Sequence, residues 1–372
     1  MGQKVLITGG AGFIGSHLAD KLLQEGHHVR ALDVLSPQVH GAGGARPPYL
    51  DPEVELIVGD IRDPAVVRRA LEGVDVVFHF AARVGVGQSM YEVSDYMAVN
   101  GLGTAVLLSA LIERPVQRLI VASSMSLYGE GLYRAPGGET VERAERTLHQ
   151  LRRGDWEVRG PTGEPLEPIA TPESKAPAIA SVYALSKFDQ ERAALLIGQA
   201  YGLPTVALRF FNTYGPRQAP SNPYTGVLAI FASRLLNGNR PLIFEDGLQR
   251  RDFVNVRDVV QACVLAMDAP GAPGLTINVG SGASHTVLEV AERTAKAVGR
   301  EDLTPEITGR YRFGDIRHCF ADITLARQML GYEPRVSLDE GLRELANWLD
   351  GQVALDRVAQ ASAELAARGL TV

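Results

Sequence analysis

Short β-branched runs alternate with longer amphipathic segments up to about residue 125. The runs are nearly all apolar, as strands buried on both faces are, and the segments between them carry apolar residues at three- and four-residue spacing. The expected strands are Lys4 to Thr8, His28 to Asp33, Glu55 to Gly59, Val74 to Phe80 and Arg118 to Ala122, and the expected helices are Ile14 to Gln24, Pro64 to Leu71 and Leu102 to Glu113. This alternation predicts an α/β fold with a Rossmann-type, doubly wound parallel sheet.

The alternation stops between about residues 130 and 180, a stretch rich in Gly, Pro, Glu and Arg. Its one periodic part, Val141 to Arg153, predicts a short helix. Long loops inside compact domains are usually functional or partly disordered, so we expect an inserted surface segment or lid. Regular structure is expected to resume with a helix at Val182 to Tyr201 and a strand at Thr205 to Phe211.

Later elements mix short strands with helices, the latter expected at Leu228 to Asn237, Val256 to Met267, Val287 to Val298 and Leu338 to Leu349. We therefore expect a dinucleotide-binding domain over residues 1–211, which contains the insertion and regains part of residues 250–280. A smaller, mixed α/β substrate-binding domain is expected over residues 212–350, and a C-terminal helix or tail over residues 351–372.

Composition narrows the class of protein. Of 372 residues, 45 % are hydrophobic and 22 % charged, and 37 basic against 43 acidic residues give a net charge of −6. These values exclude a mainly disordered or collagenous chain. A mildly acidic chain has no electrostatic footprint for nucleic acid or for an anionic membrane surface, so neither is an expected partner.

The ends of the chain and its cysteines add further expectations. Met1 to Lys4 lead directly into the first strand without a signal peptide, and no apolar run approaches 18 residues. We therefore expect a cytoplasmic enzyme without a membrane span. Cys263 and Cys319 lack metal-ligand spacing, so no metal site is expected.

A glycine-rich turn provides the strongest local motif, Thr8-Gly9-Gly10-Ala11-Gly12-Phe13-Ile14-Gly15, placed between an expected strand and an expected helix. Gly9 and Gly12 let the backbone approach a pyrophosphate, and the helix N-terminus supplies N–H donors. Asp33 ends the second expected strand 21 residues after Gly12, where a carboxylate accepts hydrogen bonds from ribose hydroxyls and repels a 2′-phosphate. The motif predicts a dinucleotide and favours NAD over NADP.

The pair Tyr183-x-x-x-Lys187 is the second motif. On a helix, four-residue spacing places both side chains on one face. An ammonium beside a phenol, together with a positive nicotinamide ring, would lower the pKa of Tyr183 enough for a general base near neutrality. Ser123 and Ser124 follow an expected strand at its carboxyl end, where doubly wound sheets bind ligands, so Ser124 could share a substrate proton with Tyr183. Each motif alone also fits an ordinary helix or turn.

Together with these motifs, several further segments resemble the extended short-chain dehydrogenase/reductase family, and within it the nucleotide-sugar epimerases and dehydratases. They are Gly59-Asp60-Ile61-Arg62-Asp63, His79-Phe80-Ala81-Ala82, the stretch from Arg209 to Gln218, and Arg251-Asp252-Phe253-Val254. The matches run in the family's order from residue 4 to about residue 350. The resemblance implies a bilobed fold, a tightly held NAD and a nucleoside-diphosphate sugar as substrate.

The resemblance also implies roles for individual residues. The implied catalytic set is Ser124, Tyr183 and Lys187. The implied cofactor site comprises Gly9, Gly12, Phe13, Ile14, Gly15, Asp33, Asp60, Ile61, Ala81, Ser123, Tyr183 and Lys187. The implied substrate site comprises Ser124, Asn212, Arg251, Arg312, Asp315 and Cys319. Guanidinium groups suit a diphosphate because they form charge-assisted, bidentate hydrogen bonds.

The reaction type follows in part from what stands after Ser124. Dehydratases and decarboxylating relatives place an acid one or two residues later, where this chain has Met125 and Ser126. Without that acid, oxidation at C4 and return of the same hydride is the simplest chemistry, which is 4-epimerisation. A reductase of a nucleotide-4-keto sugar would use the same three residues, and a non-catalytic NAD-binding protein would need only the glycine turn.

One departure from the family concerns the sugar. Tyr183 follows Ser124 by 59 residues, an unusually long interval, which places the insertion beside the sugar site and resembles epimerases of deoxythymidine-diphospho-deoxysugars such as rhamnose. A UDP-hexose is the other candidate.

Apolar faces on the helices expected at Leu102 to Glu113 and Val182 to Tyr201 could pair across a two-fold axis, so we expect a homodimer.

Overall fold

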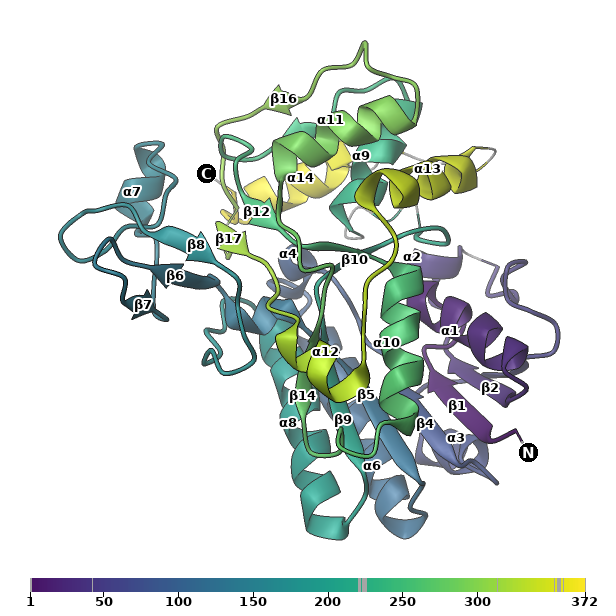
Figure 1. Ribbon diagram of the computed structural model, residues 1–372. Coiled ribbons are helices and arrows are strands. Elements are labelled where there is room, and N and C mark those ends of the chain that lie inside the picture. Colours follow the sequence, from purple (N-terminus) through teal and green to yellow (C-terminus); the bar gives the residue numbers. More distant parts are fainter. Residues whose placement is uncertain are drawn as a thin grey trace.

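The computed structural model describes residues 2–41, 43–219, 222, 226–312, 314–350, 352, 356 and 358–371. Its centre is a seven-stranded parallel sheet with the order β14-β9-β5-β4-β1-β2-β3 (Figure 1). The strands are β1 (Lys4–Thr8), β2 (His28–Asp33), β3 (Glu55–Val58), β4 (Val76–His79), β5 (Arg118–Ser124), β9 (Thr205–Phe210) and β14 (Thr276–Val279). The order reverses between β1 and β4, which confirms the expected doubly wound sheet and marks the edge where such sheets bind ligands.

Helices cover both faces of the sheet. One face carries α1 (Phe13–Gln24), α10 (Val256–Asp268) and α12 (Thr324–Leu330), and the other carries α3 (Pro64–Ala70), α6 (Gly103–Glu113) and α8 (Val182–Tyr201). Successive residues of β1 show the two layers, because Ile7 packs with the core of the first face and Leu6 with that of the second. Burial on both sides explains the nearly continuous apolar strands.

Helix α8 has the bounds that its apolar pattern predicts. The Ser181 hydroxyl accepts a hydrogen bond from the Ala184 N–H at 3.1 Å and caps the helix, and Gly202 ends it in the left-handed conformation at φ 67°. The cap fixes where the helix starts, so Tyr183 lies in its first turn, at the carboxyl edge of the sheet.

A second lobe lies beyond this edge, in the upper part of Figure 1. It contains α9 (Val227–Leu236), α11 (Val287–Ala297) and α13 (Leu338–Leu349), with a core that includes Leu228, Val290 and Leu342. Its short strands are β10 (Asn212–Tyr214) with β13 (Phe253–Asn255), β11 (Leu242–Ile243) with β16 (Glu306–Ile307), and the sheet β15 (His285–Thr286), β12 (Arg250–Arg251) and β17 (His318–Cys319).

The inserted segment is more regular than expected. It forms an antiparallel sheet of β6 (Leu132–Arg134), β7 (Thr140–Val141) and β8 (Glu167–Ile169), and a helix α7 (Leu148–Arg152) much shorter than the predicted Val141 to Arg153. Val141 pairs in β7, and Thr147 caps α7 through a hydrogen bond from the Gln150 N–H. A small core forms beneath the sheet from Tyr133, Ala144, Val158 and Leu166. Sequence periodicity missed the strands because they are only two or three residues long.

Buried ion pairs join the insertion to the second lobe. Arg146 of the insertion contacts Glu130 at 3.2 Å and Glu245 at 2.7 Å. Arg317 contacts Glu245 at 3.0 Å and Asp246 at 2.6 Å, and it also pairs with Glu157 of the insertion. Because Arg317 and Glu245 are fully buried, these contacts hold the insertion in one position.

Replacing Arg317 with Met is expected to lower the free energy of unfolding by about 3–5 kcal/mol, since the substitution leaves the buried Glu245 carboxylate with one cation fewer. Urea unfolding measures the loss. The control is Arg134→Met, which breaks an exposed pair with Glu167 on the same insertion and should cost about 1 kcal/mol or less. Equal losses in the two variants would contradict a structural role for the buried pairs.

The remaining short elements lie near the edge between the lobes. They are α2 (Pro37–His40), α4 (Val86–Ser89), α5 (Val93–Tyr96), the π-helix η1 (Met97–Leu102), the 3-10 helix η2 (Met125–Tyr128) and the C-terminal helix α14 (Val358–Ala367). Helix α14 reaches the first lobe, where Glu364 accepts a hydrogen bond from Tyr91 at 3.2 Å. Thr371 then forms a strand bridge with Arg312 of the second lobe. The C-terminal segment therefore contacts both lobes.

Among the described residues, one helical stretch, Val93–Glu113, is long and apolar enough to cross a membrane by length and composition alone. In the fold, 44 % of its most apolar window is buried, and Leu107 and Leu111 pack in the core beside the sheet. The core helix of a globular domain passes the same test.

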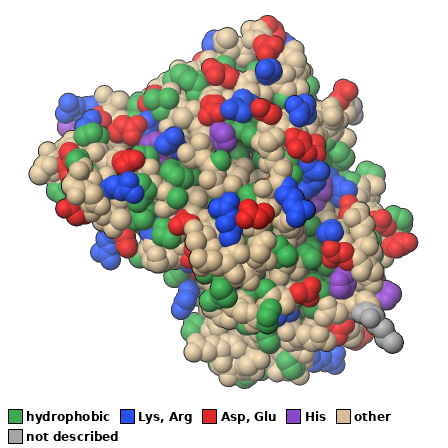
Figure 2. All heavy atoms as spheres, viewed as in Figure 1, with side chains coloured by type: hydrophobic (Ala, Val, Ile, Leu, Met, Phe, Trp, Pro, Cys, Tyr) green, Lys and Arg blue, Asp and Glu red, His purple; other side chains and the backbone are tan. Residues whose placement is uncertain are grey.

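Charge is mixed on the face that Figure 2 shows, where acidic and basic side chains alternate over both lobes and the insertion. Ion pairs are also common among the described residues, for example Arg257 with Glu340 at 2.6 Å and Arg293 with Asp339 at 3.0 Å. This face therefore presents no single-sign field, in line with the small net charge.

Candidate functional site

The glycine turn joins β1 to α1 at the carboxyl edge of the sheet. Gly9 has φ 72°, and a Cβ at Gly15 would lie 2.5 Å from the Gly9 carbonyl oxygen, so both positions require glycine. Gly12 differs, because a Cβ there would meet only that same oxygen, at 3.3 Å. It is the N-cap of α1 and provides no side-chain cap. The first N–H groups of the helix are thus left for an anionic ligand.

Asp33 lies against this turn at the end of β2. Its Oδ2 accepts a hydrogen bond from the Ala11 N–H at 3.0 Å, and its Oδ1 accepts one from the Leu35 N–H at 2.9 Å. Both bonds come from the backbone and leave further lone pairs on each oxygen. The Asp33 carboxylate is therefore held beside the glycine turn, the position that the sequence predicts for it.

The other predicted cofactor residues surround the same edge. Phe13 and Ile14 begin α1, and the Ala81 N–H donates to Thr8 Oγ1 at 3.2 Å directly beside Gly9. Asp60 is bound by Arg62 at 2.6 Å, which lowers the pKa of its carboxyl group. Ile61 is buried against Gly103 at the start of α6.

Ser124 and Tyr183 meet at the same edge. Ser124 ends β5, and its Oγ accepts hydrogen bonds from the Ser126 N–H at 3.2 Å and from the Ser126 hydroxyl at 2.9 Å. Because both bonds are accepted, the Ser124 proton is free to donate toward Tyr183, and, against the effect of burial, the interaction with Ser124 lowers the pKa of the Tyr183 phenol. The ring of Tyr183 packs edge-to-face on Tyr96 at 6.5 Å, which fixes its orientation.

The pKa of Tyr183 differs from the sequence expectation. Burial raises it above the usual value, and the hydrogen bond from Ser124 opposes that rise. The expected lowering by Lys187 is not seen, and the Lys187 ammonium instead donates a hydrogen bond to Gln190 Oε1 at 2.7 Å. Burial also lowers the pKa of Lys187, to about 7. The protein alone thus holds Tyr183 as a neutral phenol.

The Ser123 hydroxyl is engaged inside the protein. It donates to Glu191 Oε2 at 2.6 Å, and Glu191 is also bound by Arg209 at 2.7 Å. All three side chains are buried between β5, β9 and α8. They fix the strand that ends at Ser124 against the helix that carries Tyr183.

Asn100 is a residue that the motifs did not reveal. It lies in the π-helical turn η1, a feature frequent at functional sites. Its side chain accepts from the Arg83 N–H at 2.7 Å and donates to Ser186 Oγ at 2.9 Å, one turn along α8 from Tyr183. A lone Asn between two helical patterns gives no signal of this contact in the sequence.

Arg251 and Asn212 mark the second side of the site. Arg251 donates to the backbone carbonyls of Arg250 and Arg317, each at 2.9 Å, and to that of Ile316. No carboxylate among the described residues lies within ion-pair distance of Arg251, and burial lowers the pKa of this guanidinium. The backbone of Asn212 bonds to Asp252, next to Arg251, while its buried Oδ1 has no hydrogen-bond partner in the described chain. The Arg251 guanidinium is suited to an anionic ligand, and Asn212 Oδ1, an acceptor, is suited to a ligand group that donates a hydrogen bond.

Arg312, Asp315 and Cys319 also lie on this side. Arg312 pairs with Asp315 at 2.9 Å and stacks over Phe244 at 4.6 Å. Cys319 is opposite Arg251 in the strand register, but it is only 1 % exposed and its Sγ lies 3.9 Å from Thr171 Oγ1. Burial raises the pKa of this thiol to about 12, so it remains a neutral, small side chain.

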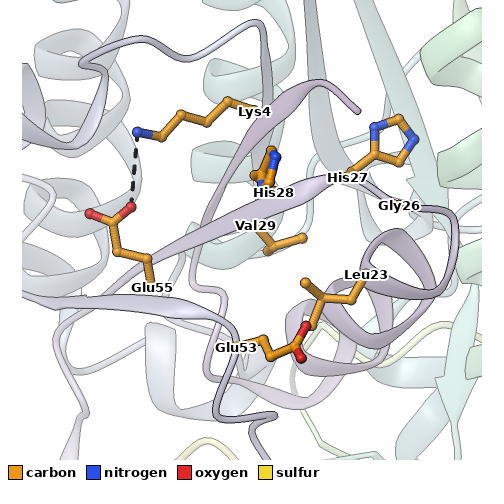
Figure 3. Close-up of a pocket in the computed structure, with 8 residues that line it drawn as sticks. All are labelled: Lys4, Leu23, Gly26, His27, His28, Val29, Glu53 and Glu55. Carbon is orange, nitrogen blue, oxygen red and sulfur yellow. Dashed lines mark ion pairs between the residues drawn. The ribbon is translucent and has the colours of Figure 1, made fainter. Parts of the chain in front are cut away.

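A pocket of about 420 Å³ lies at the opposite, amino-terminal ends of β1 and β2 (Figure 3). Lys4 and Glu55 form an ion pair across it at 4.0 Å, and His27 and Glu53 lie on its other side. None of the predicted site residues lines it. This pocket is therefore separate from the predicted site, whose residues lie at the other end of the sheet.

Comparison with known proteins identifies the family. The sequence model of the NAD dependent epimerase/dehydratase family matches residues 5–150 and 157–280. The chain belongs to this family. The match includes the glycine turn, Ser124 and the Tyr183 and Lys187 pair, which confirms the resemblance based on those motifs.

Individual relatives in the family are similar over nearly their whole length. A dTDP-L-rhamnose 4-epimerase of Burkholderia thailandensis is 34 % identical over 94 % of this chain and 95 % of its own. A dTDP-glucose 4,6-dehydratase of an Actinoplanes strain is 30 % identical over 93 % of this chain and 97 % of its own. The crystal structure of a Thermus thermophilus UDP-glucose 4-epimerase in complex with NAD has 33 % identity and a TM-score of 0.74, and covers 94 % of this chain and 100 % of its own. The family thus contains two reactions, and the site must distinguish them.

Proposed function

We propose that the protein is an NAD-dependent 4-epimerase of a nucleoside-diphosphate sugar, an isomerase. The observation that carries the proposal is the meeting of Ser124, at the end of β5, with Tyr183 in the first turn of α8, the helix that also holds Lys187. Both positions after Ser124 lack an acid, and Ser126 instead bonds to the Ser124 oxygen. This arrangement provides a base at one sugar hydroxyl without a second acid for elimination.

The residues at the first edge fit NAD. The uncapped start of α1 suits the pyrophosphate, and Asp33 suits the adenosine ribose hydroxyls. Lys187 would hold the nicotinamide ribose. Bound NAD would take hydride from C4 of the sugar and return it to the other face, and its positive ring would lower the pKa of Tyr183.

The side chains of this chain would handle the proton. Tyr183 would accept the proton of the sugar O4 hydroxyl and later return it, and Ser124 would donate a hydrogen bond to O4 or relay that proton. The positive charge of Lys187 would favour the phenolate form of Tyr183 once the site is closed to water. Since the cofactor ends as it began, the protein has no need to release it between turnovers.

The second lobe would bind the nucleotide diphosphate. The Arg251 guanidinium contacts only carbonyl groups, so a diphosphate would neutralise it, while Asn212 Oδ1 would accept a hydrogen bond from a hydroxyl of the ligand. Arg312 would reach the same ligand by exchanging its contact with Asp315, and Cys319 would leave room beside the sugar. We assign cofactor binding to the sheet-centred lobe and substrate binding to the lobe that starts near residue 212.

Replacing Arg251 with Met is expected to raise KM for the nucleotide sugar by about 100-fold while kcat stays near the wild-type value. The diphosphate does not change during the reaction, so its contact contributes equally in the ground and transition states. The matched control is Arg250→Met, on the same strand, where the exposed side chain stacks over Phe320. Steady-state kinetics that show a loss in kcat with an unchanged KM would contradict this role.

Incubation with a panel of uridine- and deoxythymidine-diphospho sugars, without added cofactor, tests the proposed function. NMR should show C4 epimers. A requirement for one mole of NADH per mole of product would instead establish the reductase, and an accumulating 4-keto-6-deoxy sugar the dehydratase. No turnover of any sugar would support a protein that only binds NAD.

The panel also decides the substrate. We propose a deoxythymidine-diphospho-deoxysugar such as dTDP-L-rhamnose, supported by the inserted segment and by similarity to the Burkholderia enzyme over nearly the whole chain. A UDP-hexose is the alternative.

We also propose a homodimer, because α8 exposes Leu185 to 44 %, Leu196 to 55 % and Tyr201 to 59 % of their surface.

A further inference from the structure

A buried chain of hydrogen bonds joins the glycine turn to Lys187. Thr8 and His79 end neighbouring strands β1 and β4 and are opposite each other in the register. Thr8 Oγ1 lies 2.8 Å from Nδ1 of His79, and Nε2 of His79 lies 2.8 Å from Thr104 Oγ1. All three side chains are buried, so their hydrogen bonds must be satisfied within the protein.

The position of each proton follows from Thr104. Its hydroxyl donates to the Asn100 carbonyl at 2.6 Å, so its oxygen must accept from His79, which then carries its proton on Nε2. Thr8 in turn donates to Nδ1. Burial lowers the pKa of His79 to about 3, which keeps the ring neutral and this tautomer stable.

Gln190 extends the chain to the lysine. Its Nε2 donates to Thr104 Oγ1 at 2.8 Å, which turns its Oε1 toward the Lys187 ammonium at 2.7 Å. If the amide were flipped, Gln190 Oε1 would face Thr104 Oγ1, whose proton is already donated to the Asn100 carbonyl. The Gln190 N–H groups would then face the Lys187 ammonium, which is also a donor. Under this assignment the 3.2 Å contact between Nε2 of Gln190 and Nε2 of His79 joins two donors and is not a hydrogen bond.

We propose that Gln190 is a positioning residue that holds the Lys187 ammonium in place, with its amide oriented from the glycine turn through Thr8, His79 and Thr104. This inference rests on the proposed function, in which Lys187 acts on Tyr183 and on the cofactor ribose. A neutral amide suits this positioning role better than a carboxylate would, because a full ion pair would hold the ammonium on the protein and away from its ligand.

The charged groups around Lys187 leave this role to Gln190. Glu191 follows on the same helix, and its charge raises the pKa of Lys187 against the lowering by burial. Arg209 and Ser123 bind the Glu191 carboxylate, however, so the hydrogen bond of the ammonium is accepted by Gln190. His79 faces the ammonium from β4 and is neutral. Tyr183 lies one turn earlier on α8 and is a neutral phenol in the protein alone.

Two substitutions of Gln190 should change Lys187 in opposite directions. Gln190→Glu places a carboxylate at the ammonium and should raise the pKa of Lys187 by about one unit or more. Gln190→Met removes the acceptor at similar volume, leaves burial less opposed, and should lower that pKa below its value of about 7. The alkaline limb of the pH profile of kcat/KM should move with the lysine in each variant.

NMR titration of lysine-labelled protein measures this pKa directly and needs no substrate. The chain contains five lysines, and the Lys187 signal is the one missing from Lys187→Met. Opposite shifts in the two variants are the expected result. The same Lys187 pKa in wild type and both variants, or shifts of the same sign, would overturn the proposal. Because the readout is free of turnover, failure of the sugar panel would leave it interpretable.

Thr104 supplies a second test if either Gln190 variant unfolds. Thr104→Val removes the hydroxyl that orients the amide and should lower the Lys187 pKa, whereas Thr104→Ser keeps the hydroxyl and should preserve the wild-type value. A purely structural role would lower the thermal midpoint of Thr104→Val and leave its lysine titration unchanged, which would also overturn the proposal.

Discussion

Tyr183→Phe is expected to lower kcat for 4-epimerisation by about 10³-fold, the typical contribution of a positioned general base. Only the hydroxyl is lost, and it is the group that bonds to Ser124. The ring should stay against Tyr96, because an edge-to-face contact does not need the phenol oxygen. KM and the NAD content of the purified protein should therefore stay near wild type.

Tyr201→Phe provides the matched control for this prediction. Tyr201 is the last residue of the same helix and is 59 % exposed. Its loss should leave kcat unchanged, as measured by NMR of the sugar epimers under saturating substrate. A Tyr183→Phe enzyme with more than about a tenth of wild-type kcat would show that another group removes the proton.

Lys187→Met is expected to lower kcat by about 10²–10³-fold, the cost of removing one preorganised electrostatic group. The substitution should also weaken NAD retention, since the ammonium is the cation proposed for the nicotinamide ribose. Stability should respond in the other direction. Lys187 is buried beside a neutral amide, so a methionine of similar length removes a desolvated charge and should keep or raise the thermal midpoint.

Lys21→Met is the control for the lysine, because Lys21 forms an exposed pair with Glu25 on α1. Activity and NAD content should match wild type there. Measuring kcat, bound NAD after gel filtration and the unfolding midpoint together separates the roles. A loss of activity together with a much lower unfolding midpoint would indicate that Lys187 stabilises the fold and does not take part in the reaction.

Local patterns in the sequence were sufficient for the sheet and for the first edge of the site. The glycine turn, Asp33 and the helix from Val182 to Tyr201 depend on interactions within a few residues or on burial of whole strands, and both leave periodic signals. Gln190 was also accessible in principle, since it follows Lys187 by three residues and so shares a helix face with it.

Contacts between distant segments were beyond the reach of the sequence. His79 and Thr104 meet Gln190 across separations of 111 and 86 residues, and no local pattern reports such a contact. The insertion was misjudged for a related reason, because its strands are short and Arg317 and Glu245 of the second lobe hold it in place. The raised pKa of Tyr183 likewise follows from burial, which the spacing does not reveal.

A labelled-hydride experiment tests the 4-epimerase most directly. The protein, as purified with its own cofactor, is given a nucleotide sugar from the panel that carries deuterium at C4, in ordinary water and without added NADH. The C4 epimer should form with the deuterium still at C4. An epimer that carries solvent hydrogen at C4, or one that forms only when NADH is supplied, would contradict hydride return within one site.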